Sequence, residues 1–229
     1  MLVKLHGIVL KSVDFSEADR IITVFTREEG LVTIFAKGVR KLTSKNRSGV
    51  QTLSYNSFNV FQGKNMYSLR RAENLYTPDY NEIHDDNIHR VLKLMLKMIP
   101  EGTREVEVFD LFLKLLHSNF DNVSVNKFRL LALKNFGHMP DSNMCAVCGR
   151  QERESGNVSA KLRSDAVITH VDLMNFSYVC SKCAAEVNAE GAAKHLDVSP
   201  RLVPIETLGY GDSELTNAID VYIDVLLES

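Results

Sequence analysis

The four cysteines of the chain fall into two pairs with the same spacing, which suits metal binding. The pairs are Cys145 with Cys148 and Cys180 with Cys183. Two residues separate the members of each pair, so one tight turn can bring both thiolates to the same ion. Two such turns complete a tetrahedral shell that leaves no open position for water or substrate. The pattern therefore predicts one structural zinc ion rather than a catalytic metal.

Other uses of these cysteines remain open. Two disulfides would suit a secreted chain, but no apolar secretory segment is visible at the start of the sequence. A C-x-x-C redox site needs one pair in a thioredoxin-like context, which we do not find. His170, between the pairs, could replace one sulfur, although an ordinary strand or loop residue is the simpler interpretation. Only a metal position left open in that way would favour a metalloenzyme.

Positive charge is concentrated in one stretch of a chain whose net charge is −2. Residues 36–75 carry a net charge of +7, with Glu73 as their one acid. Such a segment on an otherwise acidic protein is typical of a local polyanion site, and the alternative is a solvated loop. The candidate nucleic-acid-binding residues are Lys37, Arg40, Lys41, Lys45, Arg47, Lys64, Arg70 and Arg71.

The first eighty residues predict a small β-barrel. Short β-branched and apolar runs at 2–13, 20–26 and 31–36 read as strands, with Gly30 supplying a positive φ in the turn between the last two. A second hairpin is expected around residues 62–65. About five short strands without a long helix close most economically into a barrel. Aromatic residues lie among its cations and could stack on bases, although alternation should turn about half of them inward. They are Tyr55, Phe58, Phe61 and Tyr67.

Beyond Pro78 the pattern becomes helical. Apolar residues recur at helical spacing over 88–99, 109–120 and 128–133, and again over 215–226. The last stripe must dock on another element, and we expect it to join the preceding helices. The predicted fold is therefore a multidomain α+β protein with a barrel over 1–80, a helical domain over 81–140 and 185–229, and an inserted four-cysteine zinc module over 141–184.

Motifs of common enzymes are missing from the sequence. There is no G-x-x-x-x-G-K-[ST] loop for ATP, no H-E-x-x-H and no G-x-S-x-G. Asp14, Glu17 and Asp19 form an acidic cluster, which we interpret as a loop between strands rather than a metal site. The sequence favours a protein without enzymatic activity.

Several segments resemble the bacterial recombination mediator family RecO. Residues 7–10 and 15–26 are similar to its opening strands, including a Glu-x-Asp sequence before an apolar strand that ends in Phe-Thr. Residues 36–44 are similar to its basic A-x-G-x-R-x segment, and Leu69 with Glu73 matches a strand end. Residues 136–149 are similar to the approach to its first cysteine pair.

The resemblance implies an OB-fold domain, a helical domain and a zinc module that holds one structural zinc ion. It also implies a protein that binds single- and double-stranded DNA, anneals complementary strands and, with its partner RecR, helps the recombinase displace single-strand-binding protein. We expect the tail of that protein to meet the helical domain beside three cations, which are Lys127, Arg129 and Lys134. The expected location is the cytoplasm, at the nucleoid, without a membrane partner. The alternative function is an RNA- or ribosome-associated OB-fold and zinc-ribbon protein.

Overall fold

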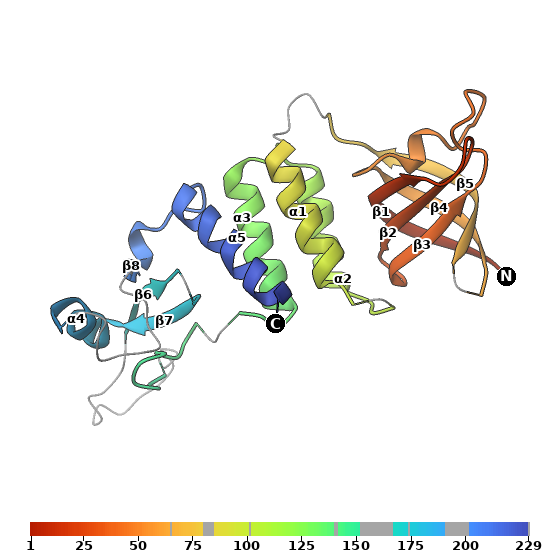
Figure 1. Cartoon of the computed structure of the whole chain (residues 1–229). Coiled ribbons are helices and arrows are strands. Elements are labelled where there is room, and N and C mark those ends of the chain that lie inside the picture. Colours follow the sequence, from red (N-terminus) through yellow and green to blue (C-terminus); the bar gives the residue numbers. More distant parts are fainter. Residues whose placement is uncertain are drawn as a thin grey trace. The chain divides into compact units, whose positions relative to one another are not determined.

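The computed structural model describes residues 1–64, 66–79, 85–100, 102–139, 142–151, 167–173, 175–190 and 202–228 (Figure 1). The strands are β1 (Leu2–Asp14), β2 (Arg20–Thr26), β3 (Gly30–Ala36), β4 (Tyr55–Gln62), β5 (Tyr67–Tyr76), β6 (Ile168–Asp172), β7 (Ser177–Cys180) and β8 (Leu202–Pro204). The α-helices are α1 (Asp85–Met98), α2 (Val106–Leu116), α3 (Asn122–Asn135), α4 (Ser181–Glu190) and α5 (Ser213–Glu228).

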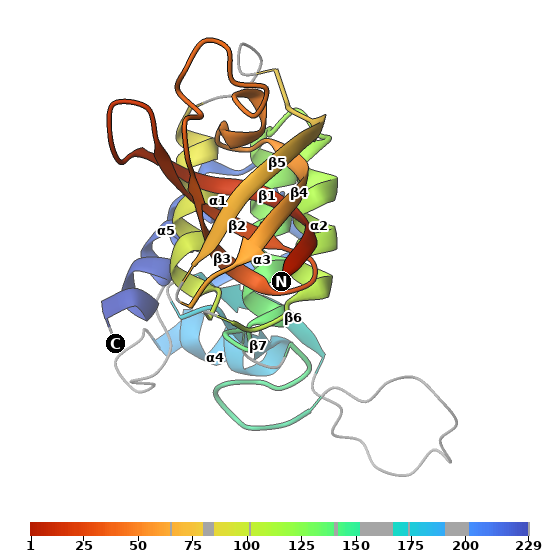
Figure 2. The same ribbon diagram turned by 90° about the vertical axis from the view of Figure 1, so that its right-hand side faces the viewer.

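The first five strands close into the predicted barrel, in the order β1-β2-β3-β5-β4 (Figure 2). The 13-residue β1 pairs with both β2 and β4, and a register shift between Val9 and Lys11 lets it curve from one partner to the other. A short parallel pairing of Ile34 with Tyr67 closes the ring between β3 and β5. This arrangement is that of an OB-fold, so the predicted fold class is confirmed.

The tight turn between β2 and β3 requires a glycine for two reasons. Gly30 has a φ of +68°, which side chains disfavour, as the sequence predicted. A Cβ atom at this position would also overlap the backbone carbonyl of Thr103, just before α2. The turn therefore lets the barrel pack closely against the helical segment that follows it.

Helices α1 to α3 lie where the helical stripes predicted them; α1 and α2 contact the barrel, and α3 packs on α1 and α2. Phe25 of the barrel meets Phe109 of α2 with ring centroids 5.4 Å apart. Beside them, the Arg27 guanidinium donates two hydrogen bonds of 3.1 and 3.0 Å to the Asp110 carboxylate and lowers the pKa of that carboxyl group. None of the described helices has the length and apolar character needed to cross a membrane.

The chain divides into two compact units, Met1–Asn135 and Phe136–Ser229. The second contains all four cysteines, a three-stranded sheet in the order β7-β6-β8, and helix α5. Within this unit the Tyr222 hydroxyl of α5 donates to the His138 carbonyl, and its ring lies 4.8 Å from that of Phe176. The grouping of 185–229 with the helices of 81–140 stays a prediction.

Candidate nucleic-acid interface and metal centre

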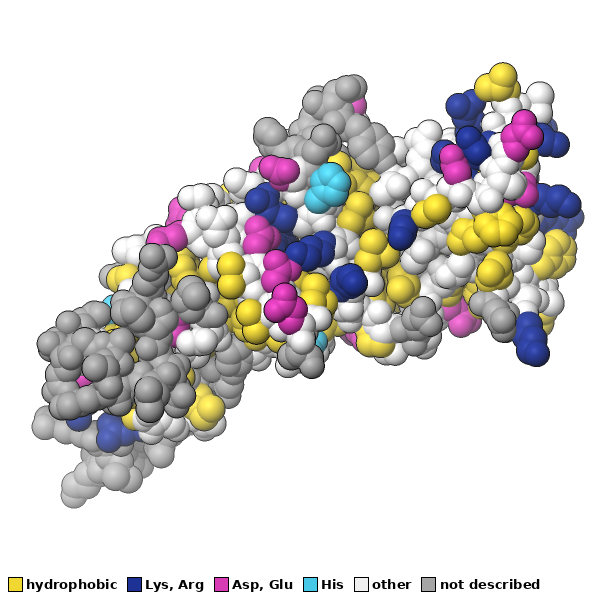
Figure 3. Space-filling model, viewed as in Figure 1, with side chains coloured by type: hydrophobic (Ala, Val, Ile, Leu, Met, Phe, Trp, Pro, Cys, Tyr) yellow, Lys and Arg dark blue, Asp and Glu magenta, His cyan; other side chains and the backbone are white. Residues whose placement is uncertain are grey.

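All eight basic residues that were predicted to bind nucleic acid lie exposed on the barrel. Five of them lie on the segment of 37–47, which we call the basic loop, and Arg70 and Arg71 lie on β5. Lys64 lies apart from these, in the turn between β4 and β5. On the face shown in Figure 3, Lys and Arg side chains are numerous over the barrel end of the chain. The barrel thus presents a cationic surface without burying any of these charges.

The base of the basic loop is fixed by a carboxylate from the neighbouring hairpin. Gly38, at φ +67°, donates its backbone N–H to Asp19 Oδ1 at 2.7 Å. This bond is the main reason that the pKa of Asp19 is lowered, and nearby Lys37 and Lys41 lower it further. The next residue, Val39, is 1% exposed and belongs to the barrel core. The loop therefore starts from a defined position. Of the acidic cluster in the sequence, Glu17 and Asp19 lie in the connection between β1 and β2 as expected, whereas Asp14 is the last residue of β1.

One carboxylate also orients two arginines at this end of the barrel. Asp14 Oδ1 accepts from Arg20 Nε at 2.8 Å, and its Oδ2 lies 3.2 Å from an Arg40 nitrogen. Arg40 donates a further bond of 2.7 Å to the Ser16 carbonyl. With Arg47, these two arginines line a hollow of about 220 Å³ whose floor includes Val39. Three guanidinium groups against one carboxylate leave a net positive hollow suited to a phosphate group.

Arg20 is a functional candidate that the sequence analysis missed. It lies outside the basic stretch of 36–75 and reads there as the first residue of a strand. The register of the β1–β2 hairpin could have revealed it, because Asp14 and Arg20 are the last pair of that ladder and lie opposite each other. Charge density along the sequence does not reveal such a contribution.

The far end of the basic loop is tied to strand β5 by one amide side chain. Asn46 accepts from the Ala72 N–H at 3.0 Å and donates to the Arg70 carbonyl at 3.3 Å. It thus bonds the backbone of β5 as a neighbouring strand would. Because Arg70 and Arg71 belong to that stretch of β5, these two hydrogen bonds hold the basic loop next to the strand that carries the other two arginines.

The four aromatic candidates differ in exposure. Phe58 is 0% exposed in the barrel core, so its prediction as a base-stacking residue was wrong; strand alternation turned it inward. Tyr55 is half-buried with its ring edge against Phe109. Tyr67 is partly buried against the core, and burial, aided by Glu29, raises the pKa of its hydroxyl. Phe61 is 47% exposed and lies 5.9 Å from the Arg70 guanidinium, which leaves it as the best-placed ring.

The three cations proposed to meet a partner's tail are also not equivalent. Lys127 and Lys134 are exposed on α3. Arg129 is 1% exposed, so its prediction as a tail contact was wrong. It belongs to the buried face of α3, together with Phe128 and Ala132.

The two cysteine pairs come together as the sequence predicted. All four sulfur atoms lie within 4.8 Å of one another, and Cys148 Sγ lies 4.0 Å from Cys180 Sγ. Tetrahedral zinc with Zn–S bonds of about 2.3 Å requires sulfur atoms about 3.8 Å apart. The donors therefore fit one thiolate-binding metal ion. His170 is a β6 residue whose Nδ1 lies 2.8 Å from the Thr169 hydroxyl, outside the cluster, as the simpler interpretation held.

Each pair is shaped by its own local structure. Gly149, at φ +68°, ends the first turn by donating its N–H to the Cys145 carbonyl, while Ala146 donates to the Tyr178 carbonyl of β7. The second pair spans the junction of β7 and α4, so the helix start brings Cys183 back towards Cys180. These elements set the four sulfur positions.

The thiols have opposed pKa shifts. Burial opposes ionisation of Cys145, but N–H groups of Cys180, Cys148 and Val147 donate to its sulfur and bring its pKa to about 7. Burial raises the pKa values of Cys180 and Cys183, and Cys145 raises both further, while hydrogen bonds with Cys183 partly offset the rise at Cys180. A metal cation would supply the charge needed to hold all four as thiolates.

Comparison with known proteins covers both candidate sites. The family model described as "Recombination protein O N terminal" matches residues 1–78, and the one described as "Recombination protein O C terminal" matches residues 88–203. The chain therefore belongs to the RecO family. The first of the two RecO matches contains the barrel and its basic residues, and the second contains most of α1, helices α2 and α3 and all four cysteines.

Individual RecO proteins agree with this assignment. The "DNA repair protein RecO" of Acetivibrio thermocellus is 29% identical over 209 residues, which cover 85% of this chain and 77% of that protein. Its namesake from Heliobacterium modesticaldum is 31% identical over 156 residues, or 65% of this chain and 56% of that protein. The one from Mycoplasma mycoides is 28% identical over 191 residues, covering 78% and 70%.

Proposed function

We propose that the protein is a non-enzymatic recombination mediator acting in DNA repair at the nucleoid. It binds single- and double-stranded DNA, anneals complementary strands and helps load a recombinase onto DNA covered by single-strand-binding protein. The observation that carries this proposal is the exposed cationic surface formed by the basic loop and β5, on the barrel of a RecO-family chain.

The physical argument for DNA rests on the form of that surface. Exposed lysines and arginines release counterions from phosphates and bind without reading the sequence. The loop carrying them is held at Asp19 and at Asn46, so its charges are presented in place rather than on a freely moving chain. Contacts to phosphates leave base edges available for pairing, which is what annealing requires.

The proposed partners extend this function. RecR is the proposed companion in recombinase loading. The tail of a single-strand-binding protein is proposed to meet the helical domain near Lys127 and Lys134. A peptide of that tail should bind the full chain several-fold more weakly when both lysines are replaced by glutamate. Equal binding by parent and variant, measured by fluorescence anisotropy, would place the tail elsewhere.

Zinc is the proposed metal of the four-cysteine cluster, in a structural role. The donor set of four thiolates is one that zinc occupies in closed sites. Cys145, Cys148, Cys180 and Cys183 would hold the ion, which would join the turn around Gly149 to the start of α4.

An annealing assay tests the proposed function. Two complementary labelled strands, one of them coated with single-strand-binding protein, are mixed with the purified chain in the absence of ATP. The proposal expects faster pairing than without the protein and no further gain on adding ATP. Pairing that is not accelerated, alongside tight binding to structured RNA, would instead favour the RNA- or ribosome-associated alternative.

A further inference from the structure

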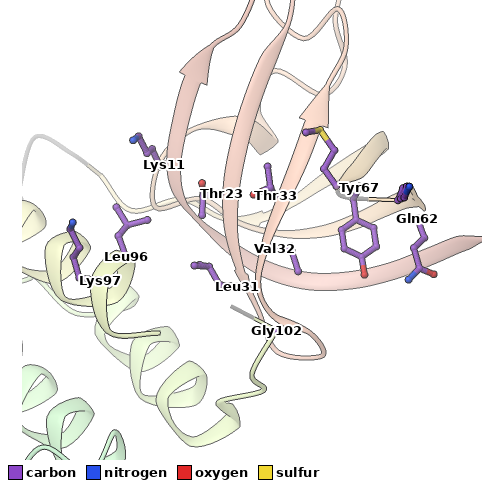
Figure 4. Close-up of a pocket in the computed structure, with 13 residues that line it drawn as sticks. Lys11, Thr23, Leu31, Val32, Thr33, Gln62, Tyr67, Leu96, Lys97 and Gly102 are labelled. Carbon is purple, nitrogen blue, oxygen red and sulfur yellow. The ribbon is translucent and has the colours of Figure 1, made fainter. Parts of the chain in front are cut away.

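A cleft of about 640 Å³ lies between the barrel and the end of α1, within the first compact unit (Figure 4). Strands β1, β2 and β3 form one wall, and the turn between β4 and β5 borders it. Leu96 and Lys97 of α1 face the strands across the opening in Figure 4. The volume is within the range of sites that enclose a small ligand or a short piece of a longer one.

The cleft carries positive charge from three separate elements. Lys11 comes from β1, Lys64 from the β4–β5 turn and Lys97 from α1, and all three are exposed. No carboxylate is found among the lining residues in the part of the chain that the structure describes. Cations spread along a cleft, rather than converging on one point, suit a chain of phosphates better than one small anion.

The remaining lining suits bases and sugars. Thr23 and Thr33 present hydroxyl groups from neighbouring strands, and Leu31 adds an apolar surface. The ring of Tyr67 lies on the side of the turn. The β2–β3 face and the β4–β5 turn are where OB-folds bind oligonucleotides, with aromatic rings as stacking platforms. Stacking on such a ring needs unpaired bases, which a single strand presents and a duplex does not, so the single strand is the matching form.

We propose that this cleft is a second nucleic-acid site, which holds a single strand with its phosphates against Lys11, Lys64 and Lys97. It is separate from the basic loop: Figures 1 and 2 place that loop and the β4–β5 turn at opposite ends of the barrel. The proposal rests on the proposed function in that the barrel binds DNA. Two sites on one barrel would let a single molecule hold two strands during annealing.

Neutralising two lysines of the cleft tests the proposal. The variant Lys11→Gln/Lys97→Gln is compared with Lys4→Gln/Lys93→Gln, which removes the same charges from the same two elements outside the cleft. Binding to oligo(dT) and to a duplex of equal length is measured by anisotropy from 0.1 to 1 M salt, and thermal melts confirm folding. Each phosphate contact on a single strand contributes a slope of about 0.7, or roughly fivefold per decade of salt.

The cleft variant should therefore bind oligo(dT) about 25-fold more weakly at 0.1 M salt, with its slope reduced by about 1.4. Its duplex affinity should be unchanged, and the control variant should match the parent on both ligands.

Four outcomes would contradict part of this picture. If the cleft variant binds oligo(dT) as the parent does, while neutralising Lys37, Lys41 and Lys45 weakens that binding, the cleft is not a DNA site and the proposed function stands. Equal losses on both ligands would overturn the single-strand assignment. Lost binding of poly-glutamate with unchanged DNA binding would assign the cleft to an acidic peptide instead. A parent that binds no DNA would refute the proposed function itself.

Discussion

At the residue scale, polar side chains that never need to touch DNA organise the cationic surface. Asp19 holds the start of the basic loop, Asn46 holds its end, and Asp14 orients Arg20 and Arg40. Carboxylates beside a polyanion site reduce its total charge, so their presence needs a structural reason. Here Asp19 binds the backbone N–H of Gly38, and Asp14 binds two guanidinium groups.

Replacing Asn46 by alanine should separate the loop from β5. Two side-chain-to-backbone hydrogen bonds would be lost, for a cost of about 1–2 kcal/mol in the free energy of unfolding. DNA affinity should fall as well, because the cations of the loop and of β5 would no longer form one surface. Denaturant unfolding and anisotropy measure the two effects. Asn59→Ala on β4 is the matched control; equal effects of the two substitutions would argue against the tethering role.

Phe61 is the ring expected to stack on a base. Phe61→Ala should weaken single-strand binding about tenfold, since base–aromatic stacking contributes about 1–3 kcal/mol per base. Leu75→Ala, which truncates an exposed apolar side chain of β5, should leave binding unchanged. Anisotropy with an oligonucleotide distinguishes them. If the Phe61 variant binds as the parent does, its ring has no part in the interface.

The sequence predicts residue roles only where type and spacing decide them. Four cysteines at matched spacing had one economical interpretation, and long charged side chains are rarely buried. Strand alternation places Phe58 and Phe61 on opposite faces of β4. Which of the two faces the core depends on the register of the barrel, and local sequence does not specify that register. The sequence did not predict the burial of Arg129, because the inward face of α3 contains the polar residues Asn126 and Arg129 and is therefore not a continuous apolar stripe.

At the scale of elements, two short structures converge to make the metal centre. A turn ending at Gly149 carries the first pair, and the β7–α4 junction carries the second. Among the residues that the structure describes, the apolar core around the two elements is a small cluster that includes Cys145, Val179 and Ala184. A bound metal is therefore expected to contribute much of the stability of this region.

Cys148→Ser should release the metal and loosen the elements around it. Residues 142–151 and 177–187 should lose hydrogen-exchange protection, while the barrel and helices α1 to α3, in the other compact unit, should keep theirs. Metal content by mass spectrometry should fall from one zinc per chain to near zero. Ser181→Ala, beside Cys180, is the control expected to retain both. A parent protein purified under reducing conditions without metal would refute the structural-zinc assignment.

Elements with strong periodicity were predicted and those held by tertiary contacts were not. The stripes over 88–99 and 109–120 lie within or overlap α1 and α2 because a 3.6-residue period is visible locally. Strands β4 and β5 extend well beyond their predicted apolar centres, because pairing with each other continues through polar residues. The short strands β6 and β8 gave no signal, since each depends on neighbours distant in sequence.

At the scale of the whole molecule, we propose that the barrel binds DNA and that the second unit holds a structural metal. Family membership and the geometry of the basic loop support the first assignment independently, because one rests on sequence relationship and the other on exposed charge. In this proposal the basic loop neutralises DNA phosphates. Its consequence is a salt dependence that scales with the number of loop cations.

A salt titration of single-stranded DNA binding tests this claim most directly. The variant Lys37→Gln/Lys41→Gln/Lys45→Gln is compared with the parent and with Lys4→Gln/Lys93→Gln/Lys114→Gln, whose three exposed lysines lie outside both proposed sites. Three lost phosphate contacts should reduce the slope of log K against log salt by about 2 for the loop variant, while the control keeps the parent's slope. A loop variant with the parent's slope and affinity would show that the basic loop does not contact DNA phosphates.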